Sequence, residues 1–269
     1  MLKHFSKTSL VIVLISIVAA CAAILYIHKR WPTITIIPLQ SNSTQNNSAS
    51  NTTSTNSTTT NSSSSAPAGT SSSSSGSLPT TFLLPIPFTP QAPTGNWDAL
   101  HNEACEEAAA IMANAYLTGD KDVVMPPASV ENQITTLTNW EQQNFGYYLD
   151  TTAAETAKMI EGVYGLKTEI INNYSEDQIK QALNDHEVVI IPEDGQLLGN
   201  PNYKTPGPIY HMLVIRGYTP DAIITNDSGT KNGRNYSYSF STIYDSGANW
   251  DHSTNTIDKN VHIAIIVSK

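Results

Sequence analysis

The chain contains very little cysteine, and this scarcity limits what its thiols can do. Of 269 residues only Cys21 and Cys105 are cysteines, and Cys21 lies within an N-terminal apolar run. An exported domain that contains only Cys105 has no second thiol for an intramolecular disulfide. Cys105 is therefore a buried passive residue, an intermolecular cross-link or a reactive nucleophile. Its setting at the expected start of a helix favours the nucleophile.

Charged residues are absent between Trp31 and Trp97. Within this stretch, residues 41–77 are almost entirely Ser, Thr and Asn. Such a segment cannot bury enough apolar surface to offset the entropy lost on ordering. We therefore expect residues 31–78 to form a disordered linker and residues 79–269 to form one folded domain.

The sequence also lacks the motifs of common cofactor sites. It has no His-Glu-x-x-His, no pair of nearby cysteines and no Gly-x-x-x-x-Gly-Lys-Ser/Thr phosphate loop, so we expect no metal and no organic cofactor. Beyond the first thirty residues there are 10 basic and 23 acidic residues, a net charge of −13. This acidity argues against a nucleic-acid partner and favours a cationic or neutral substrate.

A long apolar run lies near the N-terminus, from Leu10 to Ile27, with basic residues on both sides. About 18 residues at about 1.5 Å each extend roughly 27 Å, enough to span a hydrocarbon core. We expect residues 1–30 to be an uncleaved single-pass anchor with the C-terminal domain outside the cytoplasm. The alternatives are a cleaved signal peptide, which gives a secreted protein, and a lipid attached at Cys21 in Val18-Ala19-Ala20-Cys21. Basic residues on both sides leave the orientation undetermined by charge.

Local patterns in the folded part predict an α+β domain, with N-terminal helices packed on an antiparallel sheet. Helices are expected from Asn102 to about Leu117, from Ser129, from Thr152 to about Gly165 and from Ser175, each beginning at a residue that caps helices well. Strands are expected at residues 167–171, 187–191, 210–218, 222–226, 236–240 and 261–267.

The position of Cys105 suits a reactive thiol. With Asn102 as the cap, Cys105 is the third helical residue, where unpaired backbone N–H groups and an adjacent imidazolium would lower the thiol pKa. Glu106 and Glu107 would oppose a thiolate. Successive helical side chains diverge by about 100°, so these two can point away from the sulfur.

A histidine and an aspartate complete a possible catalytic set. His211 opens the apolar run of residues 211–215, and Asp227 follows the next expected strand, 16 residues later. On a hairpin this spacing places the carboxylate beside the start of the first strand, where it could fix the imidazole tautomer. The plain alternatives are a structural histidine and an ordinary turn at Asn226-Asp227-Ser228-Gly229.

Taken together, these segments resemble the C39-like cysteine peptidases, bacterial papain-fold proteins related to the peptidase domain of bacteriocin exporters. The segments that carry the resemblance are Pro85-Ile86-Pro87-Phe88-Thr89-Pro90-Gln91, Trp97, Ala104-Cys105-Glu106-Glu107-Ala108, Tyr210-His211-Met212-Leu213-Val214-Ile215-Arg216-Gly217-Tyr218 and Asn226-Asp227.

The resemblance implies a role for each site residue. Cys105 would be the nucleophile, His211 the general base and Asp227 the group that orients it. The side chain of Gln91 and the backbone N–H of Cys105 would form the oxyanion hole. Many relatives have Asp-Pro where this chain has Asp227-Ser228, which leaves the shape of that loop open. The exporters also carry an ATPase and a transmembrane bundle that this sequence lacks, so their export role does not carry over.

The function expected from the sequence is hydrolysis of a peptide or amide bond by a membrane-anchored cysteine peptidase or amidase outside the cytoplasm. The mechanism would use a Cys-His-Asp triad and a thioester intermediate. The substrate could be a peptide, a protein or a cell-wall amide. The alternatives are a catalytically silent binding or adhesion domain on a stalk, and a thiol acyltransferase.

Overall fold

The computed structural model describes residues 77–269 apart from residue 122. The expected anchor at residues 1–30 and almost all of the expected linker lie outside these residues, so both stay predictions. Within the described part, no helix combines the length and the apolar character needed to cross a membrane.

The domain contains both helices and strands, in an order that begins mainly with helices and ends mainly with strands. The helices are α2 (Cys105–Thr118), α3 (Pro127–Asn144), α4 (Ala153–Tyr164), α5 (Glu176–Asn184), α6 (Gly195–Leu198) and α7 (Phe240–Asp245). The strands are β1 (Phe82–Leu83), β2 (Lys167–Asn172), β3 (Val188–Glu193), β4 (His211–Tyr218), β5 (Ile223–Asn226), β6 (Arg234–Tyr238), β7 (Ala248–Asp251), β8 (Thr256–Lys259) and β9 (Ile263–Ser268).

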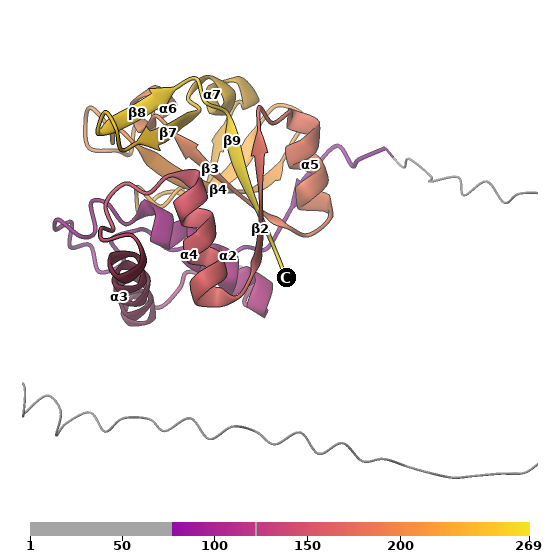
Figure 1. The fold of residues 1–269 in the computed structure, drawn as a ribbon. Coiled ribbons are helices and arrows are strands. Elements are labelled where there is room, and N and C mark those ends of the chain that lie inside the picture. The colour runs from indigo at the N-terminus through magenta and orange to yellow at the C-terminus, as the bar shows by residue number, and fades with distance from the viewer. Residues whose placement is uncertain (1–76, 122) are drawn as a thin grey trace, which may run out of the picture. The chain divides into compact units, whose positions relative to one another are not determined.

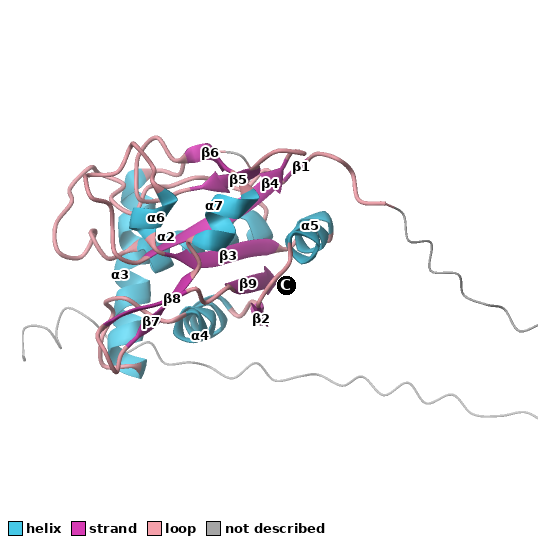
Figure 2. Ribbon diagram, turned by 90° about the horizontal axis from the view of Figure 1, so that it is seen from above, coloured by secondary structure: helices cyan, strands magenta, loops and turns pink. Residues whose placement is uncertain are grey.

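One antiparallel sheet organises the domain. Its strand order is β2-β9-β3-β4-β5-β6, and β1 pairs with β4 outside this path. β7 and β8 form a separate hairpin. In Figure 1, α2, α3 and α4 lie together at the lower left, α6, α7 and the β7–β8 hairpin lie above them, and α5 lies at the right. Figure 2 shows the same elements from above. The expected α+β class, helices on an antiparallel sheet, is confirmed.

The strands β3 and β4 form the centre of the core. Every residue of both strands is buried, as expected for strands covered on both faces. The helix α2 packs against β4, and its residues from Ala108 to Ala113 are fully buried. Since Cys105 is the first residue of α2 and His211 the first of β4, this packing sets two expected site residues at the starts of adjacent elements.

Two helix starts predicted from capping residues are confirmed. At α4, the Thr152 side chain accepts from the Glu155 N–H and the Glu155 carboxylate accepts from the Thr152 N–H, a capping box. α4 ends at Gly165, which adopts the left-handed conformation. At α5, Ser175 and Gln178 form the same arrangement.

The predicted start of α2 is wrong. The helix begins at Cys105 with Ala104 as its cap, so Cys105 is the first helical residue, not the third. The reason is a separate turn before the helix: Asp98 accepts the N–H groups of Leu100 and His101, and the Asn102 side chain donates to the Trp97 carbonyl. Asn102 therefore belongs to that turn and cannot cap α2.

Other local predictions need adjustment. α3 begins two residues before Ser129, with Pro127 in its first position, where the missing proline N–H has no intrahelical partner to lose. The strand expected at residues 236–240 is β6, which ends at Tyr238, because Ser239 caps α7 by accepting from the Thr242 N–H. The elements β1, α6, α7 and the β7–β8 hairpin were not predicted.

The burial of β4 gives a direct test of the core. Leu213→Ala removes a fully buried side chain from the central strand, so it should lower the free energy of unfolding by about 2–5 kcal/mol. Leu197→Ala is the matched control, because this leucine is 56% exposed and its loss should cost under about 0.5 kcal/mol. Urea unfolding of both variants measures the difference, and equal losses would contradict the assigned core.

Candidate active site

The Cys105 thiol is almost enclosed. The residue is 4% exposed and stands at the N-terminus of α2. A backbone hydrogen bond from Met212 reaches it, so the sulfur lies beside the start of β4, next to His211 in the chain. The fold therefore brings the expected nucleophile to the strand that carries the expected base.

The closest side-chain partner of the thiol is Glu106. The Cys105 Sγ donates to Glu106 Oε2 at 2.9 Å, and Glu106 Oε1 accepts the backbone N–H of Thr151 at 3.0 Å. The expectation that Glu106 can point away from the sulfur is therefore wrong. Its side chain turns back because the Thr151 N–H, contributed by the loop before α4, holds one carboxylate oxygen. Glu107 points elsewhere and lies beside Glu141 of α3.

This setting raises the pKa of the Cys105 thiol well above its ordinary value. Burial contributes most, followed by the charge of Glu106, the hydrogen bond to Glu106 and the charge of Asp150. The hydrogen bond from the Met212 backbone acts in the opposite direction. The lowered thiol pKa expected at a helix N-terminus is thus not found, because desolvation and neighbouring acids outweigh the helix end.

His211 and Asp227 form a buried pair. His211 Nε2 lies 2.9 Å from Asp227 Oδ1, and their side chains are 1% and 0% exposed. β4 and β5 pair as a hairpin in which Val214 faces Asn226, so Asp227 follows β5 close to the start of β4. The predicted proximity is confirmed. Among the described residues, no hydrogen bond to the second ring nitrogen, Nδ1, is found, which leaves that atom available for a proton.

Asp227 is held by several further donors. Its Oδ2 accepts from Tyr203 at 2.6 Å, Tyr238 at 2.7 Å and Asn200 at 2.9 Å, and its Oδ1 also accepts the Gly229 N–H at 3.0 Å. Burial alone would raise the pKa of the Asp227 carboxyl, but the charge of His211 and these hydrogen bonds lower it to about 2. The three side-chain donors were not predicted, because no local pattern in the sequence marks a tyrosine or an asparagine as a partner of a distant carboxylate.

Gln91 connects the turn that follows Asp227 with the turn that precedes Cys105, through its backbone and its side chain. Its N–H donates to the Ser228 carbonyl at 2.9 Å, and its Nε2 donates to the carbonyls of His101 and Asn102, both at 3.0 Å. The side chain thus fixes the turn that precedes Cys105. Its predicted role as an oxyanion donor stays a prediction, and it requires one of these amide hydrogens to turn toward the substrate.

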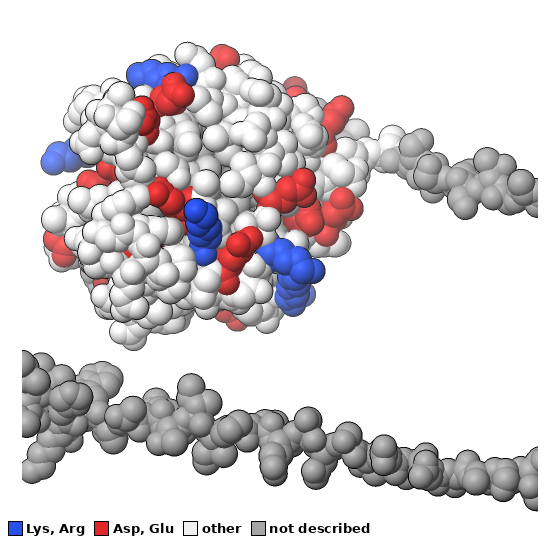
Figure 3. All heavy atoms as spheres, viewed as in Figure 1, with Lys and Arg blue, Asp and Glu red and all other residues white. Residues whose placement is uncertain are grey.

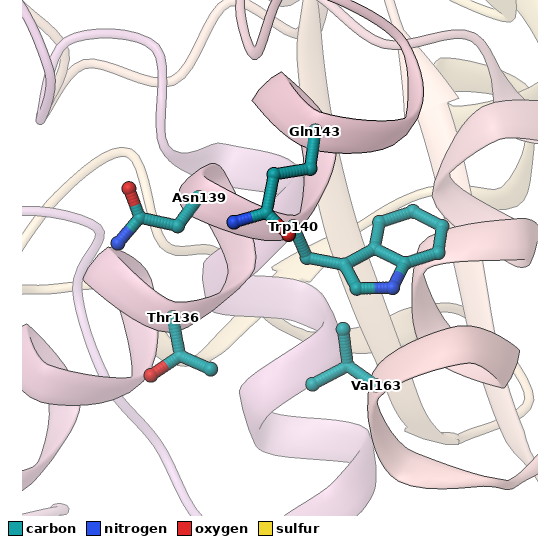
Figure 4. Close-up of a pocket in the computed structure, with 5 residues that line it drawn as sticks. All are labelled: Thr136, Asn139, Trp140, Gln143 and Val163. Carbon is teal, nitrogen blue, oxygen red and sulfur yellow. The ribbon is translucent and has the colours of Figure 1, made fainter. Parts of the chain in front are cut away.

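Two other features of the described residues bear on possible ligands. No group of three or more His, Cys, Asp or Glu side chains between residues 77 and 269, residue 122 left aside, could hold a metal ion. A pocket of about 340 Å³ lies between α3 and α4, lined by Thr136, Asn139, Trp140, Gln143 and Val163 (Figure 4). None of the expected site residues lines it.

Comparison with known proteins identifies the family of this chain. The model of the Peptidase C39 like family matches residues 83–260, a range that includes Cys105, His211 and Asp227. The chain belongs to the C39-like peptidase family. This membership supports a peptidase-type function and the papain-like fold.

No curated protein matches this C39-like chain. Among solved structures, a candidate C39-like peptidase from Bacillus anthracis is similar, with 12% sequence identity and a TM-score of 0.44. The similarity covers 70% of this chain and 97% of the other.

The Asp227 pKa predicts how stability depends on pH. Because the folded-state pKa is lowered to about 2, the carboxylate stabilises the fold fully above the unfolded value of about 4 and loses this effect as pH falls through about 2. The stability advantage of the wild type over Asp227→Asn should shrink by about 2 kcal/mol between about pH 5 and pH 2. Urea unfolding over this range measures it, and a difference independent of pH would contradict the assignment.

Proposed function

We propose that this C39-like protein is a cysteine peptidase or amidase that uses Cys105, His211 and Asp227. The observation that carries the proposal is the buried His211–Asp227 pair at 2.9 Å, with Nδ1 of the ring left without a partner among the described residues. Membership of the C39-like family supports it independently.

The chemistry follows from this arrangement. The Cys105 proton passes to His211 Nδ1, and the thiolate attacks a peptide or amide carbonyl. Asp227 holds the imidazole through Nε2 and stabilises the imidazolium that forms. The backbone N–H of Cys105, with Gln91 after a turn of its side chain, stabilises the oxyanion. His211 then gives its proton to the leaving amine, and water releases the acyl group from the sulfur.

The charge of the domain favours neutral or cationic substrates. Residues 77–269 contain 10 basic and 23 acidic residues, and acidic side chains are spread over the face seen in Figure 3. An anionic substrate would meet a repulsive field. Neutral or cationic peptides, proteins and cell-wall amides fit this condition.

A specific observation favours a second function, a binding domain without turnover. The Cys105 thiol donates to Glu106, and its pKa is raised, which is the reverse of what a ready nucleophile requires. A binding domain has no need of a thiolate. The reactivity of the thiol therefore separates the two functions.

The test is the pH dependence of Cys105 alkylation by iodoacetamide in the full-length protein, quantified on the Cys105 peptide by mass spectrometry. His211→Ala should slow labelling below pH 7 by about 100-fold or more, because the thiol loses its proton acceptor. His186→Asn is the control, since His186 is exposed and its left-handed backbone suits asparagine. Equal labelling in all three proteins would favour the binding domain.

Turnover is tested with Cys105→Ala. This variant should lose all hydrolysis found for the wild type in a screen of peptides and cell-wall amides, because no acyl-enzyme can form. An added amine identifies acyl transfer if the amide of that amine accumulates. Hydrolysis that survives in Cys105→Ala would refute the mechanism.

We further propose that residues 1–30 anchor the protein in a membrane with residues 79–269 outside the cytoplasm. Alkaline extraction should leave the full-length chain in the membrane and release a chain that begins at Trp31. The intact mass of the mature protein distinguishes the alternatives: loss of the N-terminal segment indicates a cleaved signal peptide, and an added acyl mass at Cys21 indicates a lipoprotein.

A further inference from the structure

The mechanism above gives no role to the side chain that lies closest to the sulfur. Glu106 is 2% exposed, and each of its carboxylate oxygens has a partner: Oε2 lies 2.9 Å from Cys105 Sγ and Oε1 lies 3.0 Å from the Thr151 nitrogen. Since one oxygen is fixed by a backbone N–H, the other is held against the thiol. A buried acid in direct contact with the reacting atom must influence its protonation.

The neighbouring residue shows that this contact is specific. Glu107 belongs to the same helical turn and is just as buried, at 1% exposed, but it lies beside Glu141 of α3, and the hydrogen bond of the thiol goes to Glu106 alone. The two glutamates therefore form a natural comparison. They share residue type, helix and burial, and they differ in their relation to the sulfur.

We propose that Glu106 is a further catalytic residue, whose carboxyl controls the proton of the Cys105 thiol. When Glu106 is ionised, it accepts the thiol proton in a hydrogen bond and keeps the sulfur neutral, because a thiolate would place two negative charges 2.9 Å apart in a buried site. When Glu106 is neutral, its O–H donates to the sulfur and stabilises the thiolate. This inference rests on the proposed function, in which that thiolate is the nucleophile.

The proton balance of activation is simple. With Glu106 neutral, the proton of Cys105 moves to His211 Nδ1, which yields a thiolate and an imidazolium with no net change of charge. Glu106 keeps its own proton and shares it with the sulfur as a hydrogen bond. No bond other than S–H breaks, and the Nδ1–H bond forms.

The surroundings of Glu106 favour the neutral form. The titratable groups that face it are Cys105 itself, Glu107 on the same helix, Asp150 on the loop before α4, Glu141 on α3 and Tyr210 before β4. Each of these groups is neutral or negative. Burial, then the charge of Glu107, raise the pKa of the Glu106 carboxyl well above its ordinary value, and the charge of Asp150 adds to them, while the hydrogen bond from Cys105 acts in the opposite direction. Glu106 therefore takes up its proton at a higher pH than an exposed glutamate.

The consequence is an active site favoured by acid. As pH rises through the pKa of Glu106, its ionisation raises the pKa of the thiol, so the fraction of thiolate paired with His211 falls. The thiolate fraction of an isolated thiol can only increase with pH. A wild-type alkylation rate that passes through a maximum and then falls as pH rises would thus identify a second acid acting on the sulfur.

The decisive comparison is Glu106→Gln with Glu107→Gln in the full-length protein, using iodoacetamide and the Cys105 peptide as before. In Glu106→Gln the new amide retains an oxygen for the Thr151 N–H and places a donor against the sulfur, so the local fold is preserved. This variant should not show the fall in labelling at high pH, and above the pH of the wild-type maximum it should be labelled at least about tenfold faster than the wild type, which corresponds to an apparent thiol pKa lower by about one unit. Glu107→Gln should not accelerate labelling. Labelling above that pH that is equal or slower in Glu106→Gln than in the wild type overturns the proposal.

The same substitution in a His211→Ala background separates this inference from the proposed function. If His211 is not the base, His211→Ala changes nothing, but Glu106→Gln in that background still lowers the apparent thiol pKa. If instead Glu106 has no influence, the double variant matches His211→Ala while His211 retains its effect. Circular dichroism checks that each variant is folded, and the maximum in the wild-type profile provides a measurement that needs no variant.

Discussion

The buried carboxylate of Asp227 fixes the positions of most of the side chains around it through hydrogen bonds. It is completely buried, and its partners come from a loop, two strands and a turn. These partners are Asn200, Tyr203, His211, Gly229 and Tyr238. A buried charge persists only where hydrogen bonds and an opposite charge replace its lost hydration. Each partner therefore has a fixed position, and the imidazole orientation follows from that of the carboxylate.

The two ends of the site differ in their electrostatics. Around Asp227, a histidine and several donors stabilise a negative charge and lower the carboxyl pKa. At the other end of the site, burial and the negative charges of Glu106 and Asp150 destabilise a thiolate at Cys105, so the thiol pKa is raised. In the proposed mechanism a thiolate forms only when a partner takes its proton, and the buried imidazole of His211 has that role. Such pairs of groups with pKa values pushed in opposite directions are typical of acid–base sites.

Local signals in the sequence predicted the elements that depend on neighbouring residues. The helix caps at Thr152 and Ser175, and the hairpin that brings Asp227 to His211, were predicted correctly, because each uses contacts within a short stretch of chain. Predictions failed where a distant or competing contact determined where an element begins or ends. α2 begins later than predicted because Asp98 accepts the N–H groups of Leu100 and His101 and so forms a separate turn before the helix. The strands of the β7–β8 hairpin are only four residues each, which is too short for an alternating apolar pattern to distinguish them from a loop.

By itself, the sequence determined the class of the domain, the family resemblance and the residues that could perform thiol chemistry. Only the tertiary structure decided which side chain reaches the sulfur. Glu106 could turn toward or away from Cys105 on an isolated helix, and the choice is made by the Thr151 N–H, 45 residues along the chain. The tyrosines that hold Asp227 were equally hidden, since burial and long-range hydrogen bonds exist only once the core has closed around them.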